Sequence, residues 1–226
     1  MVLKSRPTNQ GIRFIVGAGI IALSIYGFYL ALAGQNSPEL FLVPETVALE
    51  ARPCTNVLSP AFSLCVPSGL KYTIGTDGAI ALRSAEAKMR GEVKLLEKLP
   101  REEEWRASLR NPLIRTFLGD ERGLSTQELM MRILSHRYNP TLMGVKAQLI
   151  PSWMKKTRNS EILIPSGADA ILFYTPAHLL GFAFAEGKIV MLSCAGSMDK
   201  AAALSIIGSI RVTSPEGQET GSLHSS

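Results

Sequence analysis

The chain has 226 residues, 46% of them hydrophobic, and 24 basic against 19 acidic residues. This length suits one domain and excludes two large ones. Three of the basic residues lie within residues 1–13, and the remaining 21 basic and 19 acidic residues nearly balance. The balance excludes a strongly basic domain of the nucleic-acid-binding kind, so no nucleic-acid partner is predicted.

An uncharged segment runs from Phe14 to Ala33 and reads FIVGAGIIALSIYGFYLALA. As an α-helix these twenty residues are about 30 Å long, the thickness of the hydrocarbon core of a bilayer. In lipid such a helix persists despite its glycines, because the backbone has no water to bond with. The segment therefore predicts a transmembrane helix over residues 14–33, which would contact the lipid bilayer.

The charges on either side of this segment predict its orientation. Residues 1–13 contain Lys4, Arg6 and Arg13 and no acidic residue, whereas the charged residues that first follow the segment are glutamates. The positive-inside rule then keeps residues 1–13 in the cytoplasm and sends the rest across the membrane. We expect a single-pass protein of a bacterial inner membrane with its domain in the periplasm.

A cleaved signal peptide is the alternative interpretation of the same segment. Ala31-Leu32-Ala33 is the A-x-A pattern that signal peptidase cuts. The apolar stretch is longer than the usual apolar region of a signal peptide, roughly 7–15 residues, which favours a retained anchor. Both interpretations place the domain on the same side of the membrane.

Composition divides the rest of the chain into three parts. Residues 34–56 contain glycine, serine and three prolines, which predicts a linker between membrane and domain. Residues 57–212 are expected to form one domain, and the polar residues 213–226 a disordered tail.

Within the domain the pattern predicts an α+β fold, with an antiparallel sheet covered by helices. Alternating residues predict strands over 62–66, 70–74, 79–83 and 91–96. Helices follow, one beginning at Pro100 and one after a capping box at Ser125. The last third predicts strands over 170–174, 179–185 and 188–194, and a final helix capped by Ser197.

The cysteines are Cys54, Cys65 and Cys194. Cys54 and Cys65 flank a short loop, and a disulfide between them would contribute about 3 kcal/mol. Cys194 lies in an apolar run and is expected to be a buried thiol. The chain has no C-x-x-C motif, so redox and haem chemistry have no support.

No motif predicts a catalytic, metal or cofactor site. Three S-x-x-K patterns occur, and Ser197 with Lys200 would be the nucleophile and base of a serine hydrolase. Ser197 is better explained as a helix cap. His136, His178 and His224 lack metal-ligand spacing. The aromatic residues Trp105, Trp153, Phe173, Phe182 and Phe184 are expected mainly in the core, although they could line a hydrophobic pocket.

Residues 170–212 resemble the C-terminal part of the PsbP-like superfamily, which includes DcrB-like lipoproteins. The resemblance rests on the hairpin GFAFAEGKIVMLSCAG and the helix end IIGSIRV, and the opening FSLCVPSGLKYT is similar to the first strand of that family. It covers residues 60–212 loosely. It implies a compact α/β sandwich and an accessory or assembly factor, and it assigns no site residue.

Three functions remain as hypotheses. The first is a membrane-anchored, non-catalytic accessory domain that binds a membrane or extracytoplasmic protein. The second is a domain that binds a lipid or small hydrophobic ligand at the membrane surface, because a sheet covered by helices can enclose an apolar pocket. The third is the serine hydrolase that would use Ser197 and Lys200.

Overall fold

The computed structural model describes residue 16 and residues 19–27, 37–84, 88–119, 123–137, 139–155, 157 and 159–213. The predicted cytoplasmic tail and all but the first residue of the predicted C-terminal tail lie outside these ranges. Of the predicted transmembrane segment, only residues 16 and 19–27 are described, and they are helical. Among the described residues, no helix has both the length and the apolar character that a membrane span requires.

The strands form two sheets. The larger has the order β1-β7-β8-β9-β10-β6-β5-β4 and the smaller β11-β3-β2. The strands are β1 (Pro44–Val47), β2 (Cys54–Leu58), β3 (Phe62–Pro67), β4 (Leu70–Ile74), β5 (Ile80–Ser84), β6 (Arg90–Leu96), β7 (Glu161–Pro165), β8 (Ala170–Tyr174), β9 (His178–Ala185), β10 (Lys188–Ala195) and β11 (Arg211–Val212).

The predicted α+β class is confirmed, but the large sheet is mixed. Its strands pair antiparallel from β7 to β4, whereas β1 pairs parallel with β7. Sequence patterns missed β1, because it is a short edge strand that contains a proline and lacks clear alternation. The four strands predicted between residues 62 and 96 are also divided between the two sheets, since β3 belongs to the small sheet.

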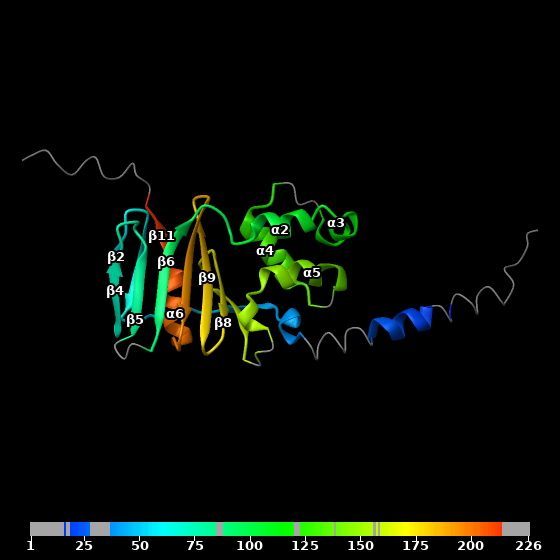
Figure 1. Cartoon of the computed structure of the whole chain (residues 1–226), viewed down its shortest axis with the longest axis horizontal. Helices are drawn as coiled ribbons and strands as arrows, with labels where there is room; N and C mark the ends of the chain where they lie inside the picture. Colours follow the sequence, from blue (N-terminus) through cyan, green and yellow to red (C-terminus); the bar gives the residue numbers. More distant parts are fainter. Residues whose placement is uncertain are drawn as a thin grey trace, which may run out of the picture.

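Two apolar cores lie on the two faces of the large sheet. One face packs against α6 (Lys200–Ser209) and the small sheet. The other face packs against a helical layer that contains α2 (Glu102–Ser108), α3 (Pro112–Leu118), α4 (Thr126–Ser135), α5 (Pro140–Leu149) and the 3-10 helix η2 (Ser152–Met154). Figure 1 shows α2 to α5 grouped together on the right of the strands.

Side-chain caps explain where most helices begin. The predicted capping box is present, since Ser125 Oγ accepts from the backbone N–H of Glu128 and the Glu128 carboxylate accepts from that of Ser125. The Asn-Pro pairs at 111–112 and 139–140 each begin a helix. The asparagine side chain caps and proline takes the first helical position, where no N–H is needed.

The predicted linker over residues 34–56 contains part of the fold. It holds the 3-10 helix η1 (Pro38–Phe41), β1 and the beginning of β2. Glu39 is buried with 3% exposure. Hydrogen bonds between β1 and β7 join this part of the chain to the large sheet. Because the two strands are far apart in the sequence, composition does not reveal this pairing.

Candidate functional site

A cavity of about 210 Å³ lies between the helical layer and β9. Leu180 and Phe182 form the sheet side, and Met130 and Ile150 extend the apolar lining. The aromatic side chain of Trp105 closes one wall. The cavity is mostly apolar, as small-molecule sites are, and the size limits it to a ligand smaller than a typical drug molecule.

Two of the lining residues each hold a buried polar atom that has no hydrogen-bond partner among the described residues: Trp105 Nε1 and Gln148 Oε1. The first is a donor and the second an acceptor. Leaving such a group buried without a partner costs about 1–3 kcal/mol, so nearly all buried polar atoms in folded proteins are paired. The two atoms belong to residues of one cavity lining, and a ligand that reached them would supply the missing partners.

Neighbouring groups fix these two side chains in position. The Arg106 guanidinium lies over the Trp105 ring, 5.1 Å from its centroid, and Arg106 Nε donates to Glu102 Oε1 over 2.6 Å. Gln148 Nε2 donates to Ser108 Oγ over 3.3 Å, which leaves the amide oxygen as the free end. The Arg106 contacts lie within α2, while Arg106 Nη2 also donates to Thr126 Oγ1 of α4 over 2.6 Å and the Gln148 bond joins α5 to α2. The two side chains are therefore held by the packing of the helical layer.

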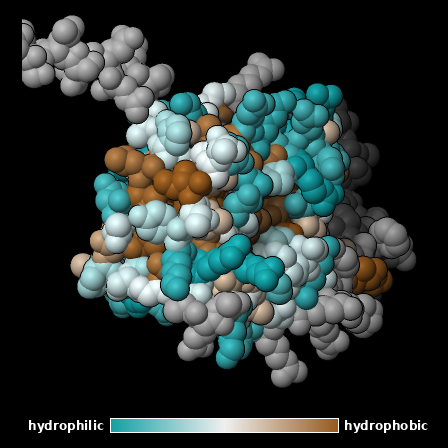
Figure 2. All heavy atoms as spheres, turned by 60° about the vertical axis from the view of Figure 1, so that its left-hand side comes forward, coloured by the Kyte–Doolittle hydropathy of each residue, from teal (hydrophilic) through white to brown (hydrophobic). Residues whose placement is uncertain are grey.

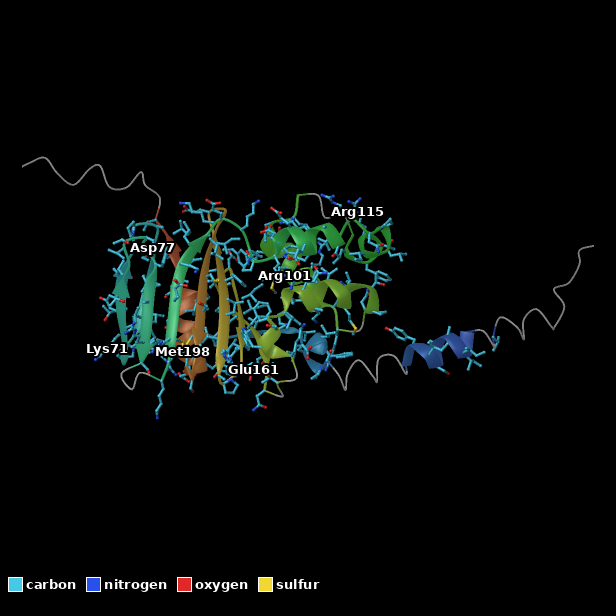
Figure 3. All side chains as sticks on the ribbon, in the orientation of Figure 1. Lys71, Asp77, Arg101, Arg115, Glu161 and Met198 are labelled. Carbon is cyan, nitrogen blue, oxygen red and sulfur yellow. A yellow bond between two sulfur atoms is a disulfide. The ribbon has the colours of Figure 1, made fainter. Side chains whose placement is uncertain are left out.

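Two cations stand among the exposed lining residues of the cavity, Arg101 and Lys155. Arg101 lies at the beginning of α2, between the helices and the sheet (Figure 3), and pairs with Glu104. That pairing raises the pKa of Arg101, chiefly through the hydrogen bond to Glu104. Lys155 has no ion-pair partner among the described residues, so the rim carries one uncompensated positive charge.

Lys146 precedes the Ala147–Gln148 wall of the cavity on α5 and is fully buried. Its ammonium group donates to the backbone oxygens of Leu42, Leu134 and His136, the last two over 2.8 and 2.9 Å. Burial, with a smaller contribution from Arg137, lowers the pKa of Lys146 to about 8. Lys146 thus fastens α5 to the end of α4 and to the segment that enters the domain.

The surroundings of Ser197 and Lys200 do not support the serine hydrolase hypothesis. Asp199, not Ser197, caps α6, since its side chain accepts from the Ala202 N–H over 3.2 Å. Lys200 Nζ donates to Glu161 Oε2 over 2.8 Å, and this hydrogen bond raises the pKa of Lys200. A general base needs the opposite shift, so Lys200 is unsuited to activate a serine at neutral pH.

The described histidines and acidic residues do not form a metal centre. Among the described residues, no group of three or more histidine, cysteine, aspartate or glutamate side chains could hold a metal ion. The ring of His178 stacks on Trp153 with centroids 5.6 Å apart. His136 lies at the end of α4, where its carbonyl accepts from Lys146, and His224 lies outside the described residues.

The sulfurs of Cys54 and Cys65 are joined in a disulfide between the adjacent strands β2 and β3, with Cα atoms 5.6 Å apart. Cys194 is a free, buried cysteine in β10. Burial raises the pKa of the Cys194 thiol to about 11, which keeps it protonated and unreactive near neutral pH.

Iodoacetamide labelling followed by mass spectrometry tests both cysteine states. At pH 8 we expect no adduct on the folded chain, because Cys194 is protonated and buried and the other two sulfurs are bonded. Unfolding without a reductant should give one adduct, at Cys194, and unfolding with a reductant should give three. Three adducts without a reductant would contradict the disulfide, and rapid labelling of the folded chain would contradict the burial of Cys194.

Sequence reasoning named part of this site. Trp105 and Phe182 were among the aromatic residues that could line a pocket, and both do, whereas Phe173 lies in the core. Gln148 was missed, because α5 itself was not predicted. The available signal was a polar amide within the apolar run VKAQLI.

Comparisons with family models, curated proteins and solved structures gave no match for this chain.

Proposed function

We propose that this protein is a membrane-anchored, non-catalytic domain that binds a small amphipathic ligand in the cavity beside Trp105 and Gln148. The observation that carries the proposal is a mostly apolar cavity, two of whose lining residues, Trp105 and Gln148, each hold a buried polar atom without a partner among the described residues. Ligand binding would supply the two hydrogen bonds that folding leaves unmade. This was the second of the hypotheses drawn from the sequence.

The membrane anchor over residues 14–33 is part of the same proposal. Four apolar side chains of the described helical residues 19–27 are more than half exposed: Ile20 (59%), Ile21 (62%), Leu23 (71%) and Ile25 (65%). Exposed apolar side chains along one helix are what a lipid-facing segment requires. The charge asymmetry around the segment supports an extracytoplasmic domain, with the periplasm as the proposed compartment.

The chemistry of the lining suggests the ligand class. The indole N–H of Trp105 can donate to a carbonyl oxygen, and Gln148 Oε1 can accept from an N–H group. One amide group offers both partners. An apolar body fits against Leu180 and Phe182, and a carboxylate would lie near Lys155 at the rim. The proposed ligand is therefore a small acylated amino acid or a molecule of the same pattern.

Gln148→Leu is expected to weaken binding of such a ligand without destabilising the fold. The probe is N-benzoylglycine, titrated into the full chain in lipid nanodiscs and followed by Trp105 fluorescence in a Trp153→Phe background. Loss of one buried hydrogen bond should raise the Kd about tenfold. The free energy of unfolding should fall by less than about 1 kcal/mol, because the substitution also removes an unpartnered buried oxygen.

Gln127→Leu is the matched control, since it makes the same change on α4, where the amide bonds to Asp169 over 3.3 Å, and Gln127 does not line the cavity. Its Kd should equal that of the parent protein. Benzamide, which lacks the carboxylate, should bind more weakly than N-benzoylglycine. The proposal fails if the parent protein does not respond to either probe, or if both leucine variants respond alike.

A protein partner is the second candidate function, favoured by an apolar edge of the molecule. Leu58 is 66% exposed at the end of β2, and Tyr72 (40%) and Ile74 (47%) are exposed on the edge strand β4. A hydrogen bond from Ser59 Oγ to the Gly78 oxygen joins the two turns beside Leu58 and Ile74. Figure 2 shows apolar surface on this side. Residue-specific cross-linking from Ile74→Cys in intact membranes, with no adduct to another protein, would exclude this candidate.

A further inference from the structure

Three cations lie side by side across the β4–β5–β6 part of the large sheet. The strand register places Lys71 opposite Arg83, and Arg83 opposite Arg90. Because neighbouring strands lie about 4.8 Å apart, the three residues span about 10 Å. All three side chains are exposed. We refer to Lys71, Arg83 and Arg90 as the basic row.

The basic row is unfavourable for the isolated domain. Like charges directly opposite one another on adjacent strands destabilise a sheet. None of the three cations has an ion pair or hydrogen bond to a side chain among the described residues. The nearest acid along β6, Glu92, is paired with Lys94 over 2.9 Å. The positive charge of the row is therefore available to an anionic partner.

The cross-strand pairing that aligns the basic row also leads to the aromatic pair formed by His178 and Trp153. Arg90 lies opposite Ala195 of β10, and Ala195 opposite His178 of β9. The His178 ring stacks on Trp153. A shallow hollow of about 360 Å³, lined by Arg90, Trp153 and Ala195, connects the row with the aromatic pair. Cations that are followed by an amphipathic indole ring are typical of a surface that meets lipid headgroups.

The basic row and the beginning of β1 lie at the same end of the strands, although β1 and β4 form the two opposite edges of the sheet. β1 begins at Pro44, which pairs with Ile162. Successive cross-strand pairs connect Glu161, the residue before Ile162, with Gly91 on β6. Gly91 is next to Arg90, so β1 begins at the same end of the strands as the basic row. Figure 3 shows Lys71 and Glu161 at the same, lower end of the strands and Asp77 at the opposite end.

We infer that the basic row and Trp153 dock on the anionic phosphate headgroups of the bilayer. The inference rests on the proposed anchor over residues 14–33. Only residues 34–37 separate that anchor from η1, and four residues reach at most about 14 Å. A domain held this close must have one end of its strands facing the membrane. Because β1 begins at the end that carries the basic row, we expect that end to face the bilayer. Each cation near an anionic surface strengthens attachment about fivefold.

The full chain in nanodiscs tests the docking. Quenching of Trp153 by brominated lipid is measured in phosphatidylcholine discs and in discs that also contain phosphatidylglycerol; Trp105 is fully buried and adds constant emission. Quenching should increase with phosphatidylglycerol and decrease at high salt. The double variant Arg83→Gln/Arg90→Gln should lose the increase, and its thermal midpoint should not fall, because a repulsion is removed.

The matched control is Arg110→Gln/Arg115→Gln, which removes the same charge from the helical layer; Arg115 lies far from Lys71 in Figure 3. This control should keep the increase with phosphatidylglycerol. Equal quenching in both kinds of disc, or equal loss in both double variants, would overturn the inference and leave the anchor and the cavity standing. A chain that does not enter nanodiscs would overturn the anchor and the inference together. Binding of a single-stranded oligonucleotide in place of phosphatidylglycerol, abolished by Arg83→Gln/Arg90→Gln, would also overturn it.

Discussion

Lys146→Met is expected to lower the free energy of unfolding by about 3 kcal/mol. Methionine fills most of the same volume but leaves the backbone oxygens of Leu42, Leu134 and His136 without their donor. Two of these oxygens belong to the end of α4, where the last carbonyls of a helix need partners and a cation is favourable. Chemical denaturation of the full chain in detergent measures the change.

Lys94→Met is the control, because it removes an exposed lysine that forms only a surface ion pair with Glu92. Exposed ion pairs contribute about 0–1 kcal/mol, so this variant should unfold almost as the parent does. Lys146→Met should also make the Leu42 segment more sensitive to protease, since one attachment is lost. Equal stability of the two variants would contradict the role of Lys146.

The pH dependence of the Lys146 contribution has a definite sign. Because its pKa is about 8 in the folded protein and 10.5 ordinarily, the unfolded chain binds more protons between these values. Stability contributed by this group therefore rises as the pH increases from about 8 to 10.5 and is constant below that window. The stability difference between the parent and Lys146→Met should increase over the same window. A difference that shrinks there would contradict the direction of the shift.

Gly196→Ala is expected to destabilise the protein by about 3 kcal/mol. Gly196 has a φ of 97°, and a Cβ there would meet the backbone oxygen of Lys88 and come within 2.9 Å of Met89 Cα. Since these contacts are backbone atoms, the segment after β10 and the segment before β6 would have to move apart. Met89 directly precedes Arg90 of the basic row, so we expect the displacement also to weaken attachment to anionic lipid.

Gly187→Ala separates the cost of the left-handed backbone conformation from the cost of the close contact with Lys88 and Met89. Gly187 has a φ of 74°, and a Cβ there would meet nothing within 4 Å. Its cost should be only the left-handed conformation, about 1 kcal/mol. Thermal unfolding of both variants measures the comparison. Equal midpoints for the two variants would show that the contact with Lys88 and Met89 is unimportant.

Elements with local signals were predictable from the sequence. The β9–β10 hairpin was expected over 179–185 and 188–194, and the structure has β9 and β10 there with a turn at Glu186 and Gly187, both at positive φ. The capping box at Ser125 is likewise a local pattern. Such features depend on neighbouring residues alone, so one sequence is enough to find them.

Features that depend on distant residues were not predictable. The Asn139–Pro140 pair is a break in one context and a helix start in another, and only packing decides between them. β1 is a strand because it pairs with β7, more than a hundred residues along the chain. Trp105 and Gln148 share a cavity because α2 and α5 pack together. No spacing rule connects those two side chains.

Native mass spectrometry of the full chain, released from mild detergent after purification from its own membrane, tests the central claim most directly. We predict that the parent protein and Gln127→Leu each retain one copy of a small molecule, and that Gln148→Leu loses it. Masses equal to the bare chain for all three proteins would contradict a ligand in the cavity beside Trp105 and Gln148.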